Sequence, residues 1–129
     1  MVDKILKNKA ILGFSIREHN NCSLQLSEAY SITAECLVRF KGKGDVFICA
    51  NDHGQLFGLK SPFDAESSIN RQLKGKIIKA VTLDQDSGDL KLHLDSGVLE
   101  LICNSSGYEC YQINGPKNLI VVVHGGKQK

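Results

Sequence analysis

The chain has 129 residues, enough for one compact domain with a hydrophobic core but too few for two of ordinary size. Hydrophobic residues make up 42% of the chain and charged residues 23%, which excludes wholesale disorder. The net charge is only +2 and the charges are interspersed, so direct nucleic-acid binding, which requires a concentrated basic stripe, is not expected.

Alternating apolar residues predict β-strands in the first part of the chain. In the first strand, Leu12, Phe14 and Ile16 fall on one face. The third strand is the longest, because apolar side chains occupy every second position from Tyr30 to Phe40. The expected elements are a short helix at residues 3–9, strands at 11–17, 22–26, 30–40 and 45–50, and a turn at 41–44 that joins the last two strands as a hairpin.

One principal helix is predicted at about residues 62–74. Ser61 and Pro62 suit its start, because serine can cap exposed amides and proline is tolerated in the first turn. An apolar stripe at four-residue spacing should face the sheet or one of its open ends. The residues of this stripe are Ala65, Ile69 and Leu73.

The clearest pattern of the sequence is a three-strand meander at residues 76–103. Two Asp-Ser-Gly segments, at 86–88 and 95–97, supply the turn-forming side chains and the glycine that tight reversals need. Between them leucines alternate with polar residues, which places the leucines toward a core and Lys91 and His93 toward water.

Two further strands are expected at 108–113 and 119–123. The second is apolar throughout, which is typical of a central strand or of one buried on both faces. Residues 11–50 and 73–123 share a loose pattern of turns and Leu-x-Leu strands, which suggests an internal repeat. The predicted fold class is therefore α+β, mainly antiparallel β, within a single domain at 1–129. Two β-meander halves would form a sandwich or a partly open barrel with one principal helix.

The cysteines indicate a reduced protein. Their number is odd and no Cys-x-x-Cys pair is present, which argues against a disulfide scaffold and against a zinc or redox motif. The first dozen residues are charged throughout, unlike a secretory leader, and no apolar run approaches the length of a membrane span. We therefore expect a cytoplasmic protein with no metal, no cofactor and no membrane contact.

No set of residues indicates an enzyme, and we expect no catalytic residue. The best candidates for a general base are His53, beside Asp52 in a glycine-containing loop, and His93 on the polar face of a strand. Sequence adjacency positions neither of them against a substrate. A small enzyme or ligand-binding domain that uses one of these histidines is the alternative to a binding protein, and an oligomeric scaffold is a third option.

Acids and tyrosines in the second half are candidates for binding another protein. Acids cluster around the turns of the meander, and such carboxylates would suit a basic partner such as a nuclease cleft. Tyrosine combines a large contact area with a polar tip, which favours it at interfaces. The candidate partner-binding residues are Asp84, Asp86, Asp89, Lys91, His93, Asp95, Tyr108, Glu109 and Tyr111.

Several short motifs occur in order in the second half, and residues 11–50 look like a matching first half. The motifs are Leu73-Lys74-Gly75, Gly88-Asp89-Leu90-Lys91-Leu92, Asp95-Ser96-Gly97, Tyr108-Glu109-Cys110-Tyr111 and Asn114-Gly115-Pro116. This pattern resembles a family of small bacterial β-rich domains found among immunity proteins for polymorphic toxins, including contact-dependent growth-inhibition systems. The resemblance implies an immunity protein that neutralises a cognate toxin domain, with a nuclease as one candidate, by occluding its active site. It would act as a monomer or weak dimer.

Overall fold

A computed structural model describes residues 1–125 of the chain. The α-helices are α1 (Val2–Leu6) and α2 (Ala65–Leu73), and the 3-10 turns are η1 (Glu18–Asn20), η2 (Ser27–Ala29) and η3 (Ala50–Asp52). The strands are β1 (Ile11–Ile16), β2 (Cys22–Leu26), β3 (Ser31–Ala34), β4 (Leu37–Gly42), β5 (Phe47–Cys49), β6 (Ala80–Leu83), β7 (Leu90–Leu94), β8 (Gly97–Ile102), β9 (Glu109–Gly115) and β10 (Leu119–His124).

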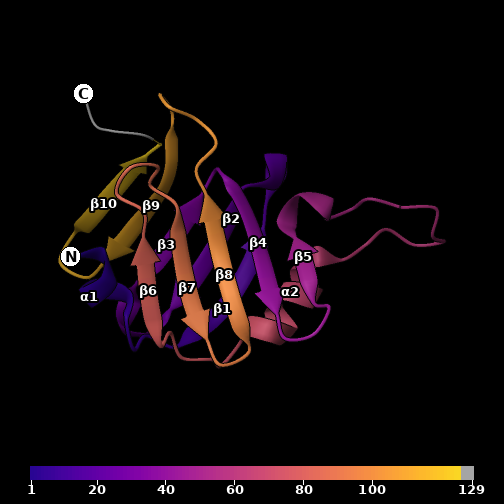
Figure 1. Cartoon of the computed structure of the whole chain (residues 1–129), viewed down its shortest axis with the longest axis horizontal. Helices are drawn as coiled ribbons and strands as arrows, with labels where there is room; N and C mark the ends of the chain where they lie inside the picture. Colours follow the sequence, from indigo (N-terminus) through magenta and orange to yellow (C-terminus); the bar gives the residue numbers. More distant parts are fainter. Residues whose placement is uncertain (126–129) are drawn as a thin grey trace.

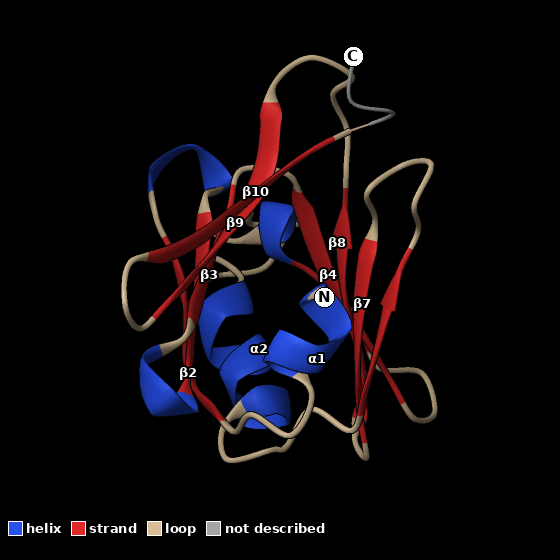
Figure 2. Cartoon of the chain, turned by 90° about the vertical axis from the view of Figure 1, so that its left-hand side faces the viewer, coloured by secondary structure: helices blue, strands red, loops and turns tan. Residues whose placement is uncertain are grey.

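The strands form two antiparallel sheets of five strands each (Figure 1). Sheet 1 has the order β1-β2-β3-β9-β10, and sheet 2 has the order β5-β4-β8-β7-β6. The sheets face each other with both helices between them, and neither closes on itself (Figure 2). The predicted α+β class with two mainly antiparallel sheets is therefore confirmed as a sandwich. The largest fully buried side chains are Tyr111, Phe40, Leu6, Ile11, Ile32, Ile69, Leu73, Ile78, Leu90, Leu92, Leu99 and Ile113.

The two halves of the chain have the same succession of elements, and each half adds a hairpin to the sheet that the other half begins. Each half, α1 to β5 and α2 to β10, contributes a three-strand meander to one sheet and a hairpin to the other. The hairpin of β4 and β5 extends sheet 2 beside β8, and that of β9 and β10 extends sheet 1 beside β3. The helices are exchanged in the same way, since α1 packs against β6 and α2 against β1. Swapping each strand for its counterpart therefore converts the order of one sheet into that of the other.

Backbone hydrogen bonds join the two halves where each helix leads into its first strand. The amide of Asn8 donates to the carbonyl of Ile78 at 2.8 Å, and the amide of Gly75 donates to the carbonyl of Ile11 at 2.8 Å. Asn8 and Gly75 both have a positive φ, 71° and 82°, which asparagine and glycine tolerate better than other residues. Each residue of one bond has its counterpart in the other, so the junction keeps the same hydrogen bonds when the two halves are interchanged.

The predicted meander at 76–103 is confirmed as β6, β7 and β8. Its first strand begins at Ala80 rather than near Lys76, because residues 76–78 pair instead with the first half. The amide of Ile11 donates to the carbonyl of Lys76 at 2.8 Å, and that of Ile78 donates to the carbonyl of Lys9 at 2.9 Å.

The predicted strand at 30–40 is two strands in different sheets. β3 ends at Ala34, β4 begins at Leu37, and the chain crosses between the sheets at Glu35 and Cys36. Every second residue from Ile32 to Phe40 is nevertheless buried, because the core lies on the same side of the chain before and after the crossing. The apolar period was thus correct, but it concealed the break.

The first strand departs from its predicted pattern at Leu12. The pairing of β1 with β2 shifts between Ile11 and Gly13, so Ile11 enters the core. Leu12 is 55% exposed instead of sharing a buried face with Phe14. A bulge of this kind places successive side chains differently from regular alternation.

The principal helix begins later than predicted. Asp64 is its N-cap and accepts a hydrogen bond from the amide of Ser67 at 2.9 Å, so the helix starts at Ala65. Ser61 and Pro62 lie in the preceding loop. The amide of Phe63 donates to the carbonyl of Gln55 at 2.7 Å, which keeps this segment out of the helix.

The last strand is an edge strand, not a central one as predicted. Within residues 1–125, β10 pairs with β9 and with no other strand. Its side chains alternate between half-buried and exposed, with Ile120 60% and Val122 40% exposed. Continuous apolar sequence therefore does not mark burial on both faces here.

Candidate protein-binding face

The outer face of sheet 2 carries two rows of side chains across the strands, and charged residues gather at the middle of these rows. Along β5, β4, β8, β7 and β6, the first row is Cys49, Arg39, Glu100, Lys91 and Thr82. The second row is Phe47, Lys41, Val98, His93 and Ala80. We call this surface the basic face. Figure 1 shows the strands that carry it side by side.

Glu100 lies at the centre of the basic face and is almost fully buried, with 2% of its side chain exposed. No element of the fold covers it; three cationic side chains surround it instead. Its Oε1 lies 2.9 Å from Nε of Arg39 and 3.5 Å from Nζ of Lys41, and its Oε2 lies 3.7 Å from Nζ of Lys91. A buried carboxylate without partners would be costly, so these cations make its burial possible.

The cations of the basic face remain accessible. Their side chains are 32% exposed for Arg39, 49% for Lys41 and 44% for Lys91. One carboxylate among three cations leaves surplus positive charge, and the ion pairs hold that charge at defined positions. Such a surface can attract and orient an acidic partner.

Aromatic and hydrogen-bonding side chains flank the charged cluster. The guanidinium carbon of Arg39 lies 5.7 Å from the ring centroid of Phe47, which is 56% exposed. On the other side, Nε2 of His93 lies 2.9 Å from Oγ1 of Thr82. Exposed Phe and Arg beside one another are typical of protein interfaces.

The matching rows of sheet 1 are neutral. Along β10, β9, β3, β2 and β1 they are Val122, Gln112, Thr33, Ser23 and Ser15, and Ile120, Asn114, Ser31, Gln25 and Gly13. The hydrogen bonds between side chains run along strands: Nε2 of Gln25 donates to Oγ of Ser23 at 2.8 Å, and Nε2 of Gln112 donates to Oδ1 of Asn114 at 2.7 Å. Thr33 therefore occupies in sheet 1 the place of Glu100 in sheet 2.

A loop with an apolar tip extends beyond the β5 edge of sheet 2. We call residues 54–63 the apolar loop; it is the long projection beside β5 in Figure 1. At its base, the amide of Gly54 donates to the carbonyl of Phe63 at 2.8 Å. Three large side chains at the tip are largely exposed, Leu56 at 52%, Phe57 at 63% and Leu59 at 61%. Large apolar side chains exposed together are unusual on a soluble surface and mark interaction sites.

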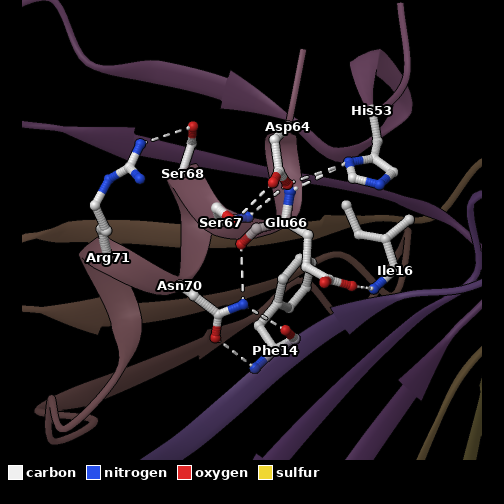
Figure 3. A network of polar contacts seen from close by, with 9 residues as sticks. All are labelled: Phe14, Ile16, His53, Asp64, Glu66, Ser67, Ser68, Asn70 and Arg71. Atoms are coloured by element: carbon white, nitrogen blue, oxygen red, sulfur yellow. Dashed lines mark hydrogen bonds and ion pairs between the residues drawn. The ribbon is translucent and has the colours of Figure 1, made fainter. Parts of the chain in front are cut away.

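His53 ties the base of the apolar loop to helix α2. Its Nδ1 accepts from the amide of Glu66 at 3.4 Å and lies 3.8 Å from Oδ1 of Asp64, beyond hydrogen-bond distance (Figure 3). Hydrogen bonds from the amide and hydroxyl of Ser67 lower the pKa of Asp64, so this carboxylate already serves as the helix cap. His53 thus has a structural role here. Two hollows of about 360 Å³, one beside α1 and one beside the β8–β9 connection, are lined by neither His53 nor His93.

The acids around the turns of the meander do not form one patch. Asp84 and Asp86 lie in the β6–β7 turn, and Asp95 lies in the β7–β8 turn at the other end of β7. Oδ1 of Asp84 accepts from the amides of Asp86 and Ser87 at 2.9 and 3.2 Å, and these bonds lower the pKa of Asp84. Asp84 therefore shapes its turn.

Asp89 and Tyr111 hold the structure together rather than face a partner. Oδ1 of Asp89 accepts from the amide of Cys103 at 2.7 Å, linking the β6–β7 turn to the end of β8. Tyr111 is fully buried, and its hydroxyl donates to the carbonyl of Gly88 at 2.9 Å. Burial raises the pKa of the Tyr111 hydroxyl above its ordinary value. The prediction that Tyr111 contacts a partner is therefore wrong for the folded chain.

The remaining predicted residues are on the surface at different places. Lys91 and His93 belong to the basic face. Tyr108 is 82% exposed and precedes β9, where Glu109 is half-buried at its start. The structure thus brings Lys91 and His93 together with Arg39, Lys41 and Glu100, which sequence reasoning missed. The missing signal was the pairing of β4 with β8, since Arg39 and Glu100 are far apart in the sequence.

Within residues 1–125, no three His, Cys, Asp or Glu side chains are arranged to hold a metal ion. No helix in this part of the chain is long and apolar enough to cross a bilayer. Comparisons of the chain with protein-family models, with curated proteins and with solved structures found no match.

Proposed function

We propose that this chain is a cytoplasmic immunity protein that binds a toxin domain through the basic face and the apolar loop, and so covers the toxin's active site. The resemblance of its turn and strand motifs to bacterial immunity proteins supplies the biological role. The exposed Phe and Arg, the charged rows and the apolar tip supply a surface of the composition that protein interfaces use.

One observation supports the choice of surface. The sheets have the same strand order, yet neutral side chains occupy in sheet 1 the places that Arg39, Lys91 and Glu100 occupy in sheet 2. The architecture therefore forms without charges at these positions. Charges that the fold does not require are available for recognition.

The charge of the basic face defines the partner. Its surplus is positive, so the toxin surface that it meets should be acidic, with an apolar pocket for the tip of the loop. This differs from the basic partner that a patch of carboxylates would have favoured. Acidic residues that bind the metal ion or activate water in a hydrolytic toxin are targets of suitable charge.

We expect a toxin to be encoded beside this gene, and its toxin domain tests the proposal. Purified protein should bind it in calorimetry and protect cells that express it. Arg39→Glu, Lys91→Glu and Glu100→Lys together should abolish binding and protection, because the charges at these three positions are reversed while residue 100 keeps two oppositely charged neighbours. The control is Gln112→Glu combined with Gln25→Glu, two outward-facing positions of sheet 1, and it should bind as the unchanged protein does.

Two outcomes would count against the proposal. Full protection by the charge-reversed variant would remove the basic face from the interface. Absence of any complex with the neighbouring toxin would remove the immunity role itself.

A Phe57→Ser variant tests the apolar loop separately. We expect it to raise the dissociation rate of the complex, since an exposed aromatic anchor contributes mainly to the lifetime of a complex.

A further inference from the structure

The four sheet edges of the sandwich differ in how they are protected. The edge of β1 is closed by helix α2: Oδ1 of Asn70 accepts from the amide of Phe14 at 2.9 Å, and Oε2 of Glu66 accepts from the amide of Ile16 at 2.7 Å (Figure 3). β5 and β6 have only three and four residues. β10 has six, and among residues 1–125 no side chain bonds to the backbone of its two central exposed residues, Ile120 and Val122.

The register of β9 shows which backbone groups of β10 are open. The amide of Glu35 donates to the carbonyl of Cys110 at 2.8 Å, so the even-numbered residues of β9 bond to the β3 side. The odd-numbered residues then bond to β10, where their partners are Leu119, Val121 and Val123. The N–H and C=O groups of Ile120 and Val122 consequently point away from the sheet.

The side chains of β10 offer no protection against pairing. Natural edge strands carry lysine, proline or inward charges that discourage strand addition, and Leu119 to Val123 contains none of these. Ile120 and Val122, which hold the open backbone groups, also have exposed apolar side chains. Beside them on sheet 1 lie Gln112 and Asn114, which are neutral. A second strand can approach without meeting like charge.

We propose that two copies of this chain associate through β10, antiparallel across a two-fold axis at Val121. Ile120 of one copy then exchanges both backbone hydrogen bonds with Val122 of the second copy, and the reverse pair does the same. An antiparallel edge is self-complementary, which a two-fold interface requires. The two copies of sheet 1 become one continuous sheet, and the outer face of sheet 2 stays open in both copies.

Sedimentation velocity on the full chain, up to the highest soluble concentration, tests this pairing. We expect a concentration-dependent dimer. Val122→Pro should abolish it while the variant stays folded, because the lost N–H is one that points to solvent and not into the ladder with β9. Ile120→Lys should do the same, and Phe47→Lys, at the counterpart position of β5, should leave the dimer intact.

Amide hydrogen exchange on the unchanged protein gives a second measurement that needs no variant. The amides of Ile120 and Val122 should exchange more slowly as concentration rises, whereas those of Val121 and Val123 are already protected in the monomer. Added salt should not dissociate the dimer, since the pairing involves no ion pair. A monomer at every concentration, a dimer that persists in Val122→Pro, or unchanged exchange at Ile120 and Val122 would each overturn the proposal.

Discussion

The outer faces of the two sheets show what the fold needs and what it does not. Both faces consist of matched rows on strands of the same order. In sheet 2, ion pairs converge on the buried Glu100; in sheet 1, Thr33 stands at that place and the side chains around it are amides and hydroxyls. The sandwich is thus compatible with either chemistry. Its architecture comes from the inner faces, and the outer faces can differ in what they recognise.

Removing Glu100, the acid at the centre of the charged row, should produce the largest difference in stability between the two sheets. In Glu100→Ala, three cations lose their shared carboxylate and a buried space remains, so we expect the free energy of unfolding to fall by about 2 kcal/mol. Partial exposure of the cations keeps the loss below that of a fully buried pair. The counterpart change Thr33→Ala, at an exposed position, should stay within about 0.5 kcal/mol in chemical denaturation. Equal losses at the two positions would contradict the special role of Glu100.

The edge strands β1 and β6 provide a second contrast. Side chains of α2 bond to the backbone of β1, whereas within residues 1–125 no side chain bonds to the backbone of β6. Asn70→Ala removes the side chain that bonds to the backbone of Phe14 and should reduce the free energy of unfolding by about 1–1.5 kcal/mol. Asp3 occupies the corresponding place on α1, and Asp3→Ala should change the unfolding midpoint little. A comparable loss in both variants would show that edge closure is not the cause.

Replacing the whole charged row should cost less than removing its acid alone. Arg39→Gln, Lys91→Ser and Glu100→Thr together give sheet 2 the residues of sheet 1. We expect the free energy of unfolding to change by less than about 1 kcal/mol, since replacing an ion-pair group with neutral residues is often close to neutral. The triple variant should still lose toxin binding. If it unfolds more readily than Glu100→Ala, the charges are structural.

The reactivity of two thiols, Cys22 in sheet 1 and Cys49 in sheet 2, should also differ between the sheets. Burial raises the pKa of Cys22 in sheet 1 to about 12; it also raises the pKa of Cys49 in sheet 2, but that thiol is half-exposed and reagents can reach it. At mildly alkaline pH a thiol reagent should therefore label Cys49 first and Cys22 only slowly. Unfolding returns the pKa of Cys22 to about 9, so its contribution to stability is present below that pH and is lost as pH rises toward about 12. Labelling of the native protein followed by mass spectrometry measures the order.

The sequence predicts the local parts of this fold well and the non-local parts poorly. Alternation and Asp-Ser-Gly turns were sufficient for β6 to β8, because their hydrogen bonds join neighbours in the chain. The crossing at Glu35 and Cys36 has neither glycine nor proline, so an unbroken period of two concealed it. Tyr108 and Tyr111 both looked suitable for an interface, and no short stretch of sequence shows that the carbonyl of Gly88 satisfies the Tyr111 hydroxyl inside the core while Tyr108 stays exposed.

The candidate site depended on the same non-local information. The alternation of β7 placed Lys91 and His93 on the outer face correctly. Glu100 looked like an ordinary polar residue between two leucines, and only the pairing of β8 with β4 and β7 surrounds it with cations. The edge position of β10 likewise follows from which hairpin joins which meander, and no short stretch of sequence contains that information.

The exchange of hairpins between the halves also sets the order in which the molecule can be completed during synthesis. When β3 and β4 leave the ribosome, each has one open side whose partner, β9 or β8, has not yet been made. Neither sheet can gain all its strands until most of the chain has emerged. Folding should therefore be late and slow, as expected for pairings between strands distant in the sequence. The protein therefore most needs protection from aggregation while only its first half has been synthesised.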